Sequence, residues 1–319
     1  MEGKNRKIMV SIIMSTYNGT AYLEEQLDSI RLQSRPADEV VISDDCSQDD
    51  TVEKTEAYIR KYHLTNWHVQ RNEVNCGWEK NFMQGIEKTK GDLLFFADQD
   101  DIWEVEKIEK MCALMEQHPE IFVLASDYTP FYMDAAVDKA RNDEKIQSDG
   151  TWKQYPFDTG FLYVHRPGCV YCVRRSFADE IRSYWFEKYP HDALFWRYAN
   201  LTGGLYLYHE PLIRFRRHAN NASSVATTGL AKKTADAEYY VDVLKGIRQF
   251  IKDKKIVISE QQKKIIGKVE RYSQYRLRFL KEHSLMCGIR LIRYLDCYYA
   301  PKTWISDWIV VVFKKEMKR

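Results

Sequence analysis

The first hundred residues alternate between apolar runs and segments with helical periodicity. Apolar runs, several rich in β-branched residues, predict four strands at residues 8–14, 39–43, 68–70 and 92–97. Apolar residues at helical spacing predict three intervening helices at residues 21–33, 52–62 and 80–89. This alternation predicts a parallel sheet with helices on both of its faces.

The remainder of the chain is less regular before it becomes helical. Apolar runs predict strands at residues 121–125 and 168–173, and residues 104–116 have the spacing of a helix. The polar stretch 134–150 is typical of a loop. From residue 232 onward the pattern is helical.

Length and composition indicate a globular protein with more than one part. The chain has 319 residues, of which 45% are hydrophobic and 29% are charged, and this balance excludes disordered, collagen-like and coiled-coil classes. We expect an α/β domain over residues 1–228 and a basic, amphipathic helical region over residues 229–319. Within the domain, residues 1–103 and 104–228 are expected to form two halves.

Charge is distributed unevenly along the chain. Residues 245–319 hold 19 Lys and Arg against 7 Asp and Glu, whereas residues 1–244 hold 29 against 39. Apolar residues recur at helical spacing in this tail, at Leu285, Ile289, Ile292, Leu295 and Tyr299. The run 304–313 is too short to span a bilayer, but its tryptophans and the basic residues after it favour a membrane interface. The alternative is a tail packed on the α/β domain or on another subunit.

The cysteines and the N-terminus bear on the compartment. Cys169 and Cys172 form a C-x-x-C pair without a second pair at the spacing of a zinc site, so buried free thiols are the better interpretation. Free thiols are typical of a reducing compartment. The apolar stretch after the basic N-terminus is too short for a secretion signal, and we expect a cytoplasmic protein, peripheral at the inner face of the cell membrane.

Polar residues follow three of the predicted strands directly. These clusters occupy residues 15–18, 44–47 and 98–101. In a parallel sheet the carboxyl ends of the strands share one edge, and ligands bind there. We therefore expect the three clusters to converge on one rim.

Three carboxylates lie within four residues in the third cluster, at Asp98, Asp100 and Asp101. Carboxylates this close repel one another unless a cation joins them, and hard divalent ions bridge carboxylates to substrate phosphates. A metal site for Mn²⁺ or Mg²⁺ is one interpretation. The other is an acidic cap for the helix predicted over residues 104–116.

Six motifs in order resemble those of family 2 glycosyltransferases. They lie at residues 10–19, 43–51, 75–82, 96–103, 190–192 and 210–221. The second resembles D-D-G-S-x-D-x-T, with Cys46 in the place of glycine, and the last resembles E-P-L…Y-R-x-H-x-N-N, with Phe215 and Ala219 departing from it. The fourth resembles F-x-D-Q-D-D-I-W, which marks a subgroup that includes rhamnosyltransferase-like enzymes of bacterial surface polysaccharide synthesis.

The resemblance implies the GT-A nucleotide-diphospho-sugar transferase fold, a Rossmann-like mixed sheet with helices on both faces, followed by a helical appendage. It implies a set of residues that bind the nucleotide and donor: Thr16, Tyr17, Asn18, Asp44, Asp45, Asn75, Gly77, Asn81, Asp98, Gln99 and Arg216. Metal ligands would be Asp98, Asp100 and His218. Either Asp44 or Asp45 can alternatively cap the helix that follows.

The subgroup also implies an inverting transfer, which needs a general base on the acceptor side. Asp192 matches its H-D motif and is the expected base, and the acceptor side would further include Asp101, Trp103 and His191. The alternative is that His191-Asp192 caps a helix beginning near Ala193.

The expected activity is transfer of a sugar from a dTDP- or UDP-linked donor, with rhamnose as the leading candidate, to a hydroxyl of a glycan or lipid-linked acceptor. A non-catalytic nucleotide-sugar-binding or membrane-associated interaction protein on the same fold is the alternative. The first turn lacks G-x-G-x-x-G, which argues against a dinucleotide-dependent dehydrogenase. The basic tail is interleaved with apolar stretches and carries no nucleic-acid-binding motif, so no nucleic-acid partner is expected.

Overall fold

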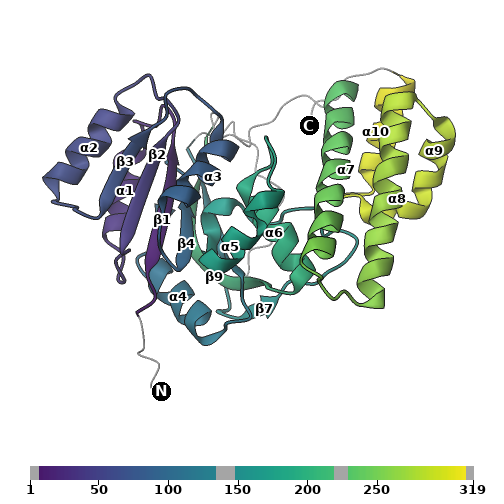
Figure 1. Ribbon diagram of the computed structural model, residues 1–319. Helices are drawn as coiled ribbons and strands as arrows, with labels where there is room; N and C mark the ends of the chain where they lie inside the picture. The colour runs from purple at the N-terminus through teal and green to yellow at the C-terminus, as the bar shows by residue number, and fades with distance from the viewer. Residues whose placement is uncertain (1–6, 134–147, 219–228, 314–319) are drawn as a thin grey trace. The chain divides into compact units, whose positions relative to one another are not determined.

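The computed structural model describes residues 7–133, 148–218 and 229–313 (Figure 1). These residues form two compact units, which we call the catalytic unit and the helical unit. The catalytic unit comprises Met1–Tyr155 and Val164–Ala219, and the helical unit comprises Pro156–Tyr163 and Asn220–Arg319. Residues 156–163, which the sequence pattern assigned to the catalytic domain, thus group with the helices. Most of the polar stretch 134–150, and the motif residues Ala219, Asn220 and Asn221, lie outside the described residues.

The four strands expected in the first hundred residues are confirmed, and they are parallel. They are β1 (Val10–Thr16), β2 (Glu39–Asp44), β3 (Trp67–Arg71) and β4 (Leu93–Ala97). β1 pairs with β2 on one side and with β4 on the other, and β2 pairs with β3. The apolar side chains of β1, β2 and β4 are buried, as the near-continuous apolar runs predict for a sheet covered on both faces, whereas Val69 in the edge strand β3 is only partly buried.

The second half of the catalytic unit extends this sheet and makes it mixed. Its strands are β5 (Ile102–Trp103), β6 (Val123–Tyr132), β7 (Trp152–Gln154), β8 (Tyr171–Arg174) and β9 (Leu205–Arg217). The strand order is β3-β2-β1-β4-β8-β6-β9-β5, with β7 paired to β9. β8 is antiparallel to both β4 and β6.

Helices cover both faces of the sheet, as expected. They are α1 (Leu23–Arg31), α2 (Thr51–Lys61), α3 (Trp78–Lys88), α4 (Lys107–Gln117), α5 (Arg175–Ile181) and α6 (His191–Thr202). In Figure 1, α3, α5 and α6 lie in front of the sheet while α1 and α2 lie behind it. The strand order explains this division. The chain adds β2 and β3 on one side of β1 and then crosses to the other side of β1 to form β4. Right-handed connections in these two directions place their helices on opposite faces of the sheet.

Two local predictions are wrong. Residues 168–170 form a 3₁₀ turn rather than the start of a strand, which begins only at Tyr171. Gly168 lies so close to His191 that a Cβ there would be 2.5 Å from Nε2 of the ring, so residue 168 packs against α6, and pairing in the sheet starts only at Tyr171. The helix expected from residue 104 begins at Lys107, because Ile102 and Trp103 first pair with β9.

The helical unit consists mainly of two long helices joined by a short connection. α7 (Leu230–Asp253) and α8 (Glu260–Glu282) pack together and are followed by α9 (Leu285–Arg290), the 3₁₀ segment η4 (Leu291–Cys297) and α10 (Lys302–Val312) (Figure 1). α8 begins with a capping box, in which Ser259 and Gln262 satisfy each other's backbone N–H groups. No helix in the described part of the chain combines the length and apolar character needed to cross a membrane.

Candidate active site

The ends of β1 and β2 are joined by the hydroxyl and carboxylate side chains of the first two polar clusters. Thr16 Oγ1 donates to Asp44 Oδ2 at 3.0 Å, and Asp44 Oδ1 accepts the backbone N–H of Ser47 at 2.8 Å. The Ser47 hydroxyl also donates to Asp44 and in turn accepts the backbone N–H of Asn18. Asp44 therefore fixes the turn after β2 against the turn after β1.

Asp45 contacts a different segment, the loop before α3. Its carboxylate accepts the backbone N–H groups of Cys76 at 2.8 Å and Gly77 at 2.9 Å, and the amide of Asn72 at 3.0 Å. It therefore holds the loop that leads into α3. Neither Asp44 nor Asp45 caps α2, whose N-cap residue is Asp50, so the capping alternative is wrong for both.

Asn81 is buried and ties α3 to two strands. Its Nδ2 donates to Ser15 Oγ and to the carbonyl of Ser43, both at 2.7 Å, and its Oδ1 accepts from the Ser43 hydroxyl at 2.7 Å. This saturated setting makes Asn81 a residue that positions the rim. Asn75, by contrast, is exposed in the loop that leads into α3. Direct contact of either residue with a donor stays a prediction.

Gln99 links the acidic cluster to the turn after β1. Its side-chain amide accepts the backbone N–H of Tyr17 at 2.8 Å and donates to the Tyr17 carbonyl at 3.0 Å. Gly19 permits this bridge, because a Cβ there would lie 2.1 Å from Gln99 Oε1. The side chains of Tyr17 and Asn18 remain exposed beside it. The structure thus brings the three polar clusters together on one rim.

The acidic loop at the end of β4 is crowded. The carboxylates of Asp98 and Asp101 and the thiol of Cys169 lie within 4.8 Å of one another. Burial and the neighbouring Asp100 raise the pKa of Asp98 to about 7. The pKa of Asp101 is raised well above its ordinary value, first by burial and then by the Asp98 carboxylate. The loop does not cap α4, whose N-cap residue is Glu106, so that alternative is also wrong.

Asp100 and Arg216 are held together at the end of β9. His218 Nε2 lies 2.7 Å from Asp100 Oδ2. Arg216 donates through Nε to the Asp100 carbonyl at 2.6 Å and through Nη2 to Glu25 at 2.5 Å, while its backbone N–H donates to Asp101 at 3.0 Å. Its guanidinium also stacks on the ring of Tyr22, 4.1 Å from the centroid. Because Arg216 is buried and committed to these contacts, it positions the acidic loop.

The donor set of this loop fits a hard divalent cation. Asp98 and Asp100 supply carboxylate oxygens and His218 supplies an imidazole nitrogen next to one of them. A cation would relieve the repulsion that raises the pKa of Asp98. The Oδ2 atom of Asp101 is buried with no hydrogen-bond partner among the described residues, which also fits an oxygen-coordinated ion. The buried Cys169 thiol, whose pKa is raised well above its usual range by burial, is a poor ligand for such an ion.

Asp192 lies in the first turn of α6, and its neighbour His191 begins the helix. The N-cap is Pro190, so His191 and Asp192 do not cap the helix, although Asp192 Oδ1 accepts the adjacent N–H of Ala193 at 2.6 Å. Burial raises the pKa of Asp192 to about 6, which suits a general base near neutral pH.

His191 is buried against aromatic side chains and is not exposed to a ligand. Its ring lies 4.1 Å from that of Phe82 and 4.9 Å from that of Phe96, and burial lowers its pKa to about 3. Trp103 is likewise buried, in β5. An acceptor-side role for these two residues, and for Asp101, stays a prediction.

Lys107 belongs to the site and the sequence analysis did not identify it. Its ammonium donates to the Cys169 carbonyl at 2.6 Å, lies 4.0 Å from the centroid of the Trp103 ring, and is fully buried beside the acidic loop. Burial lowers the pKa of Lys107 to about 7. The sequence offered no signal for it, because Lys107 begins α4 only in the structure and would lie inside the helix expected from residue 104.

The chain resembles bacterial enzymes along much of its length. A dTDP-rhamnosyl transferase of Shigella flexneri is 28% identical over 222 residues, which cover 65% of this chain and 72% of the relative. An uncharacterized glycosyltransferase of Haemophilus influenzae is 38% identical over 113 residues, but the chain spans only 36% of that relative's length.

Solved structures share the fold. A TarS structure from S. aureus in complex with UDP-GlcNAc has a TM-score of 0.62 at 19% identity and covers 96% of this chain and 82% of that chain. A mannosyltransferase from Pyrobaculum calidifontis in complex with GDP-Man and Mn²⁺ has a TM-score of 0.54 at 17% identity, with coverage of 98% and 89%. These neighbours bear out the GT-A class. The model of glycosyl transferase family 2 matches residues 11–182, and the chain therefore belongs to that family of glycosyltransferases.

Proposed function

We propose that the protein is an inverting, divalent-metal-dependent glycosyltransferase that moves a sugar from a nucleoside-diphosphate donor to a hydroxyl of a glycan or lipid-linked acceptor in bacterial polysaccharide synthesis. The observation that carries the proposal is the placement of the candidate carboxylates on two different elements. Asp98 and Asp100 are grouped with His218 at the rim, in the loop after β4. Asp192 lies in the first turn of α6, where burial raises its pKa to about 6. Because Asp192 lies on a different element from the proposed metal ligands, it is left to accept a proton on the acceptor side.

In the proposed reaction Asp192 takes the proton of the acceptor hydroxyl as its oxygen attacks the anomeric carbon. The bond from that carbon to the diphosphate oxygen breaks from the opposite side, and the nucleoside diphosphate leaves with the bonding electrons. Burial keeps Asp192 basic enough for this step near neutral pH.

The rim would hold the donor. We expect Asp44 and Asp45, at the end of β2, to meet the base and ribose together with the exposed side chains of Tyr17 and Asn18. Asp98, Asp100 and His218 would hold Mn²⁺ or Mg²⁺, which when bound offsets negative charge on the leaving diphosphate. Arg216 and Gln99 keep the acidic loop in place through their contacts with Asp100 and Tyr17.

The donor is proposed to be dTDP- or UDP-linked, with rhamnose as the first sugar to test. One relative is a dTDP-rhamnosyl transferase, which supports a pyrimidine nucleotide, while the fold neighbours hold both UDP-GlcNAc and GDP-Man. A lipid-linked acceptor would place the protein at the inner face of the cell membrane.

Calorimetric titration with a panel of nucleotide-diphosphate sugars, with and without Mn²⁺ or Mg²⁺, tests the proposal. We expect metal-dependent binding of one donor and its loss in Asp100→Asn. Asp179→Asn, which changes a half-exposed carboxylate in α5, is the matched control and should bind normally. A folded protein that binds no donor with either metal would refute the proposal. Donor binding without turnover on any acceptor would favour the non-catalytic binding protein instead.

A further inference from the structure

The helical unit exposes an ordered row of apolar side chains. Leu285, Met286, Ile289 and Ile292, in α9 and at the start of η4, are between 52% and 61% exposed. The opposite side of the same turns is buried, since Cys287 is 4% exposed and Leu291 is fully buried. We call the four exposed residues the apolar stripe.

An apolar row at helical spacing normally faces the core. Here the inward positions are taken by Cys287, Gly288 and Leu291, and the stripe points outward. Isolated exposed apolar residues are common, but a contiguous group marks an interaction surface. The stripe is therefore a feature that needs a partner.

α10 packs against α9 and carries exposed apolar side chains of its own. Trp304 Nε1 donates to the Gly288 carbonyl at 3.0 Å, which holds α10 against α9. Ile305 and Val312 in α10, and Phe313 directly after it, are also about half exposed or more. Together with the apolar stripe they form what we call the outer face.

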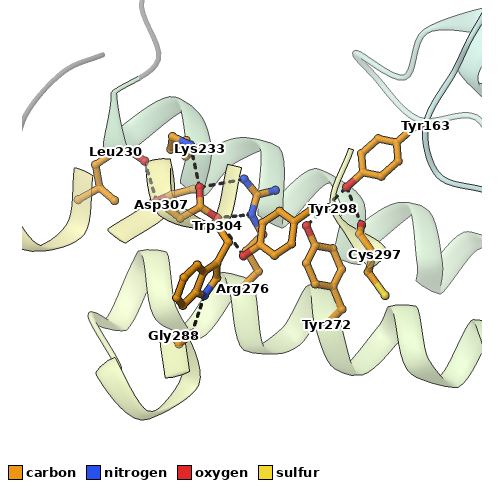
Figure 2. A network of polar contacts seen from close by, with 11 residues as sticks. Tyr163, Leu230, Lys233, Tyr272, Arg276, Gly288, Cys297, Tyr298, Trp304 and Asp307 are labelled. Atoms are coloured by element: carbon orange, nitrogen blue, oxygen red, sulfur yellow. Dashed lines mark hydrogen bonds and ion pairs between the residues drawn. The ribbon is translucent and has the colours of Figure 1, made fainter. Parts of the chain in front are cut away.

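A buried ionic network holds α10 in this orientation (Figure 2). Asp307 is fully buried and accepts from Lys233 Nζ at 2.7 Å, Arg276 Nε at 2.8 Å and the Tyr298 hydroxyl at 3.2 Å. These partners come from α7, α8 and the segment before α10. Because the side of α10 that carries Asp307 is anchored inside the unit, the outer face is a fixed surface rather than one position of a loose helix.

The charges around the outer face are positive. Arg290, Arg293 and Lys302 are exposed in the same segment. Of the two acidic residues between 285 and 313, Asp307 is buried in the network and Asp296 lies 2.7 Å from Lys268. The unbalanced charge at this surface is therefore cationic.

We propose that the outer face seats the protein on an anionic lipid surface, with the apolar stripe entering the headgroup region and the cations meeting lipid phosphates. Apolar side chains bordered by Arg and Lys have the chemistry of an interfacial helix. A second copy of the chain fits less well, since a two-fold contact pairs the same surface on both copies and would bring two cationic faces together. This proposal rests on the proposed function in one respect: a lipid-linked acceptor would lie in the membrane that the outer face binds.

The test is co-sedimentation of the full chain with phosphatidylcholine vesicles, with and without about a third of phosphatidylglycerol. We expect binding to the anionic vesicles that weakens as salt is raised. The double variant Ile289→Asp/Ile292→Asp should lose at least about tenfold in affinity. Arg290→Glu/Arg293→Glu should lose about fivefold or more per arginine and most of the salt dependence.

Val257→Asp is the matched control, because Val257 is 96% exposed in the connection between α7 and α8 and lies outside the outer face. It should bind as the unmodified protein does, and circular dichroism should show the same helix content in all variants. Equal binding by the stripe variant, or no binding of the unmodified protein to anionic vesicles, would overturn the proposal. So would self-association in sedimentation velocity that the stripe variant abolishes, since the occupant would then be a second copy.

Donor titration without vesicles separates this proposal from the proposed function. Normal donor binding together with absent vesicle binding would overturn only the membrane surface. Vesicle binding by a protein that binds no donor would support the membrane surface and refute the transferase.

Discussion

The catalytic and helical units place polar and apolar residues in opposite ways. In the catalytic unit the apolar strand residues are buried and the polar clusters gather at the strand ends. In the helical unit a carboxylate is buried with two cations, while the apolar stripe is exposed. A buried charge needs ionic partners and an exposed apolar row needs a cover. The first unit therefore gathers its polar groups at one edge, where we propose a polar ligand binds, and the second presents an extended apolar surface.

The difference also shows in how the polar groups are used. On the rim, Asn81, Gln99 and Arg216 are saturated by contacts with the backbone of neighbouring segments. Such contacts preorganise the groups that face a ligand and do not themselves need to touch it. In the helical unit the Asp307 network orients an apolar surface instead.

The largest effect is expected from Asp192→Asn, which removes the proposed base from the catalytic unit. We expect kcat to fall about 10²–10⁴-fold while donor affinity is retained, because the change leaves the rim intact. Turnover assays and donor titration on the same preparation measure both quantities. Asp179→Asn serves as the control, and a kcat for Asp192→Asn within about threefold of the unmodified protein would rule out a base at this position.

The next effect concerns the helical unit. Asp307→Asn leaves Lys233 and Arg276 buried without their counter-charge and should lower the free energy of unfolding by about 3–5 kcal/mol. Asp296→Asn disrupts an exposed ion pair with Lys268 and should cost about 1 kcal/mol or less. Urea unfolding followed by tryptophan fluorescence compares the two. Equal effects would mean that the Asp307 network does not anchor the helical unit.

The pH dependence of turnover follows from the raised pKa of Asp192, about 6. The base must be deprotonated, so kcat should be half-maximal near that pH and fall about tenfold for each further unit of acidity. Stability should change in the opposite direction, because folding favours protonated Asp192 and this contribution is lost as pH rises through about 6. A kcat that stays flat down to pH 5, about one unit below this pKa, would contradict the assignment.

A smaller effect is expected from the bridge between the acidic loop and the turn after β1. Gln99→Ala removes two hydrogen bonds to Tyr17, each worth about 0.5–1.5 kcal/mol, and should raise the KM for the donor about tenfold. Gln249→Ala removes an exposed amide from the helical unit and should leave KM unchanged. An unchanged donor KM in Gln99→Ala would show that the rim keeps its geometry without this bridge.

The smallest effect concerns Cys46, which stands where the family usually has glycine. Its φ of 65° lies in the left-handed region, which costs a residue with a Cβ about 1–2 kcal/mol. Cys46→Gly should therefore stabilise the protein by at most about 1 kcal/mol, since glycine also loses more backbone entropy on folding. Thermal unfolding measures the change, and a clear loss of stability would mean that the thiol contributes more than the strain it imposes.

The sequence by itself determined the first four strands, their helices and the positions of the polar clusters at the strand ends. These follow from local patterns, because apolar runs and turn residues report the path of the chain directly. The order of the motifs likewise indicated the family. Local patterns could not show that Gly168 packs on His191 and shifts the start of β8, or that Ile102 and Trp103 pair with β9.

The tertiary structure alone decided which side chains of these patterns are buried, which are held in internal contacts and which face water. Lys107 is buried and donates to the Cys169 carbonyl, and Arg216 contacts Asp100 and Glu25 rather than being left open at the rim. Periodicity marked Leu285, Ile289 and Ile292 as one side of a helix but could not show which side faces water. That choice depends on contacts between distant segments, here the anchoring of α10 through Asp307 to α7 and α8, and spacing along the chain carries no information about them.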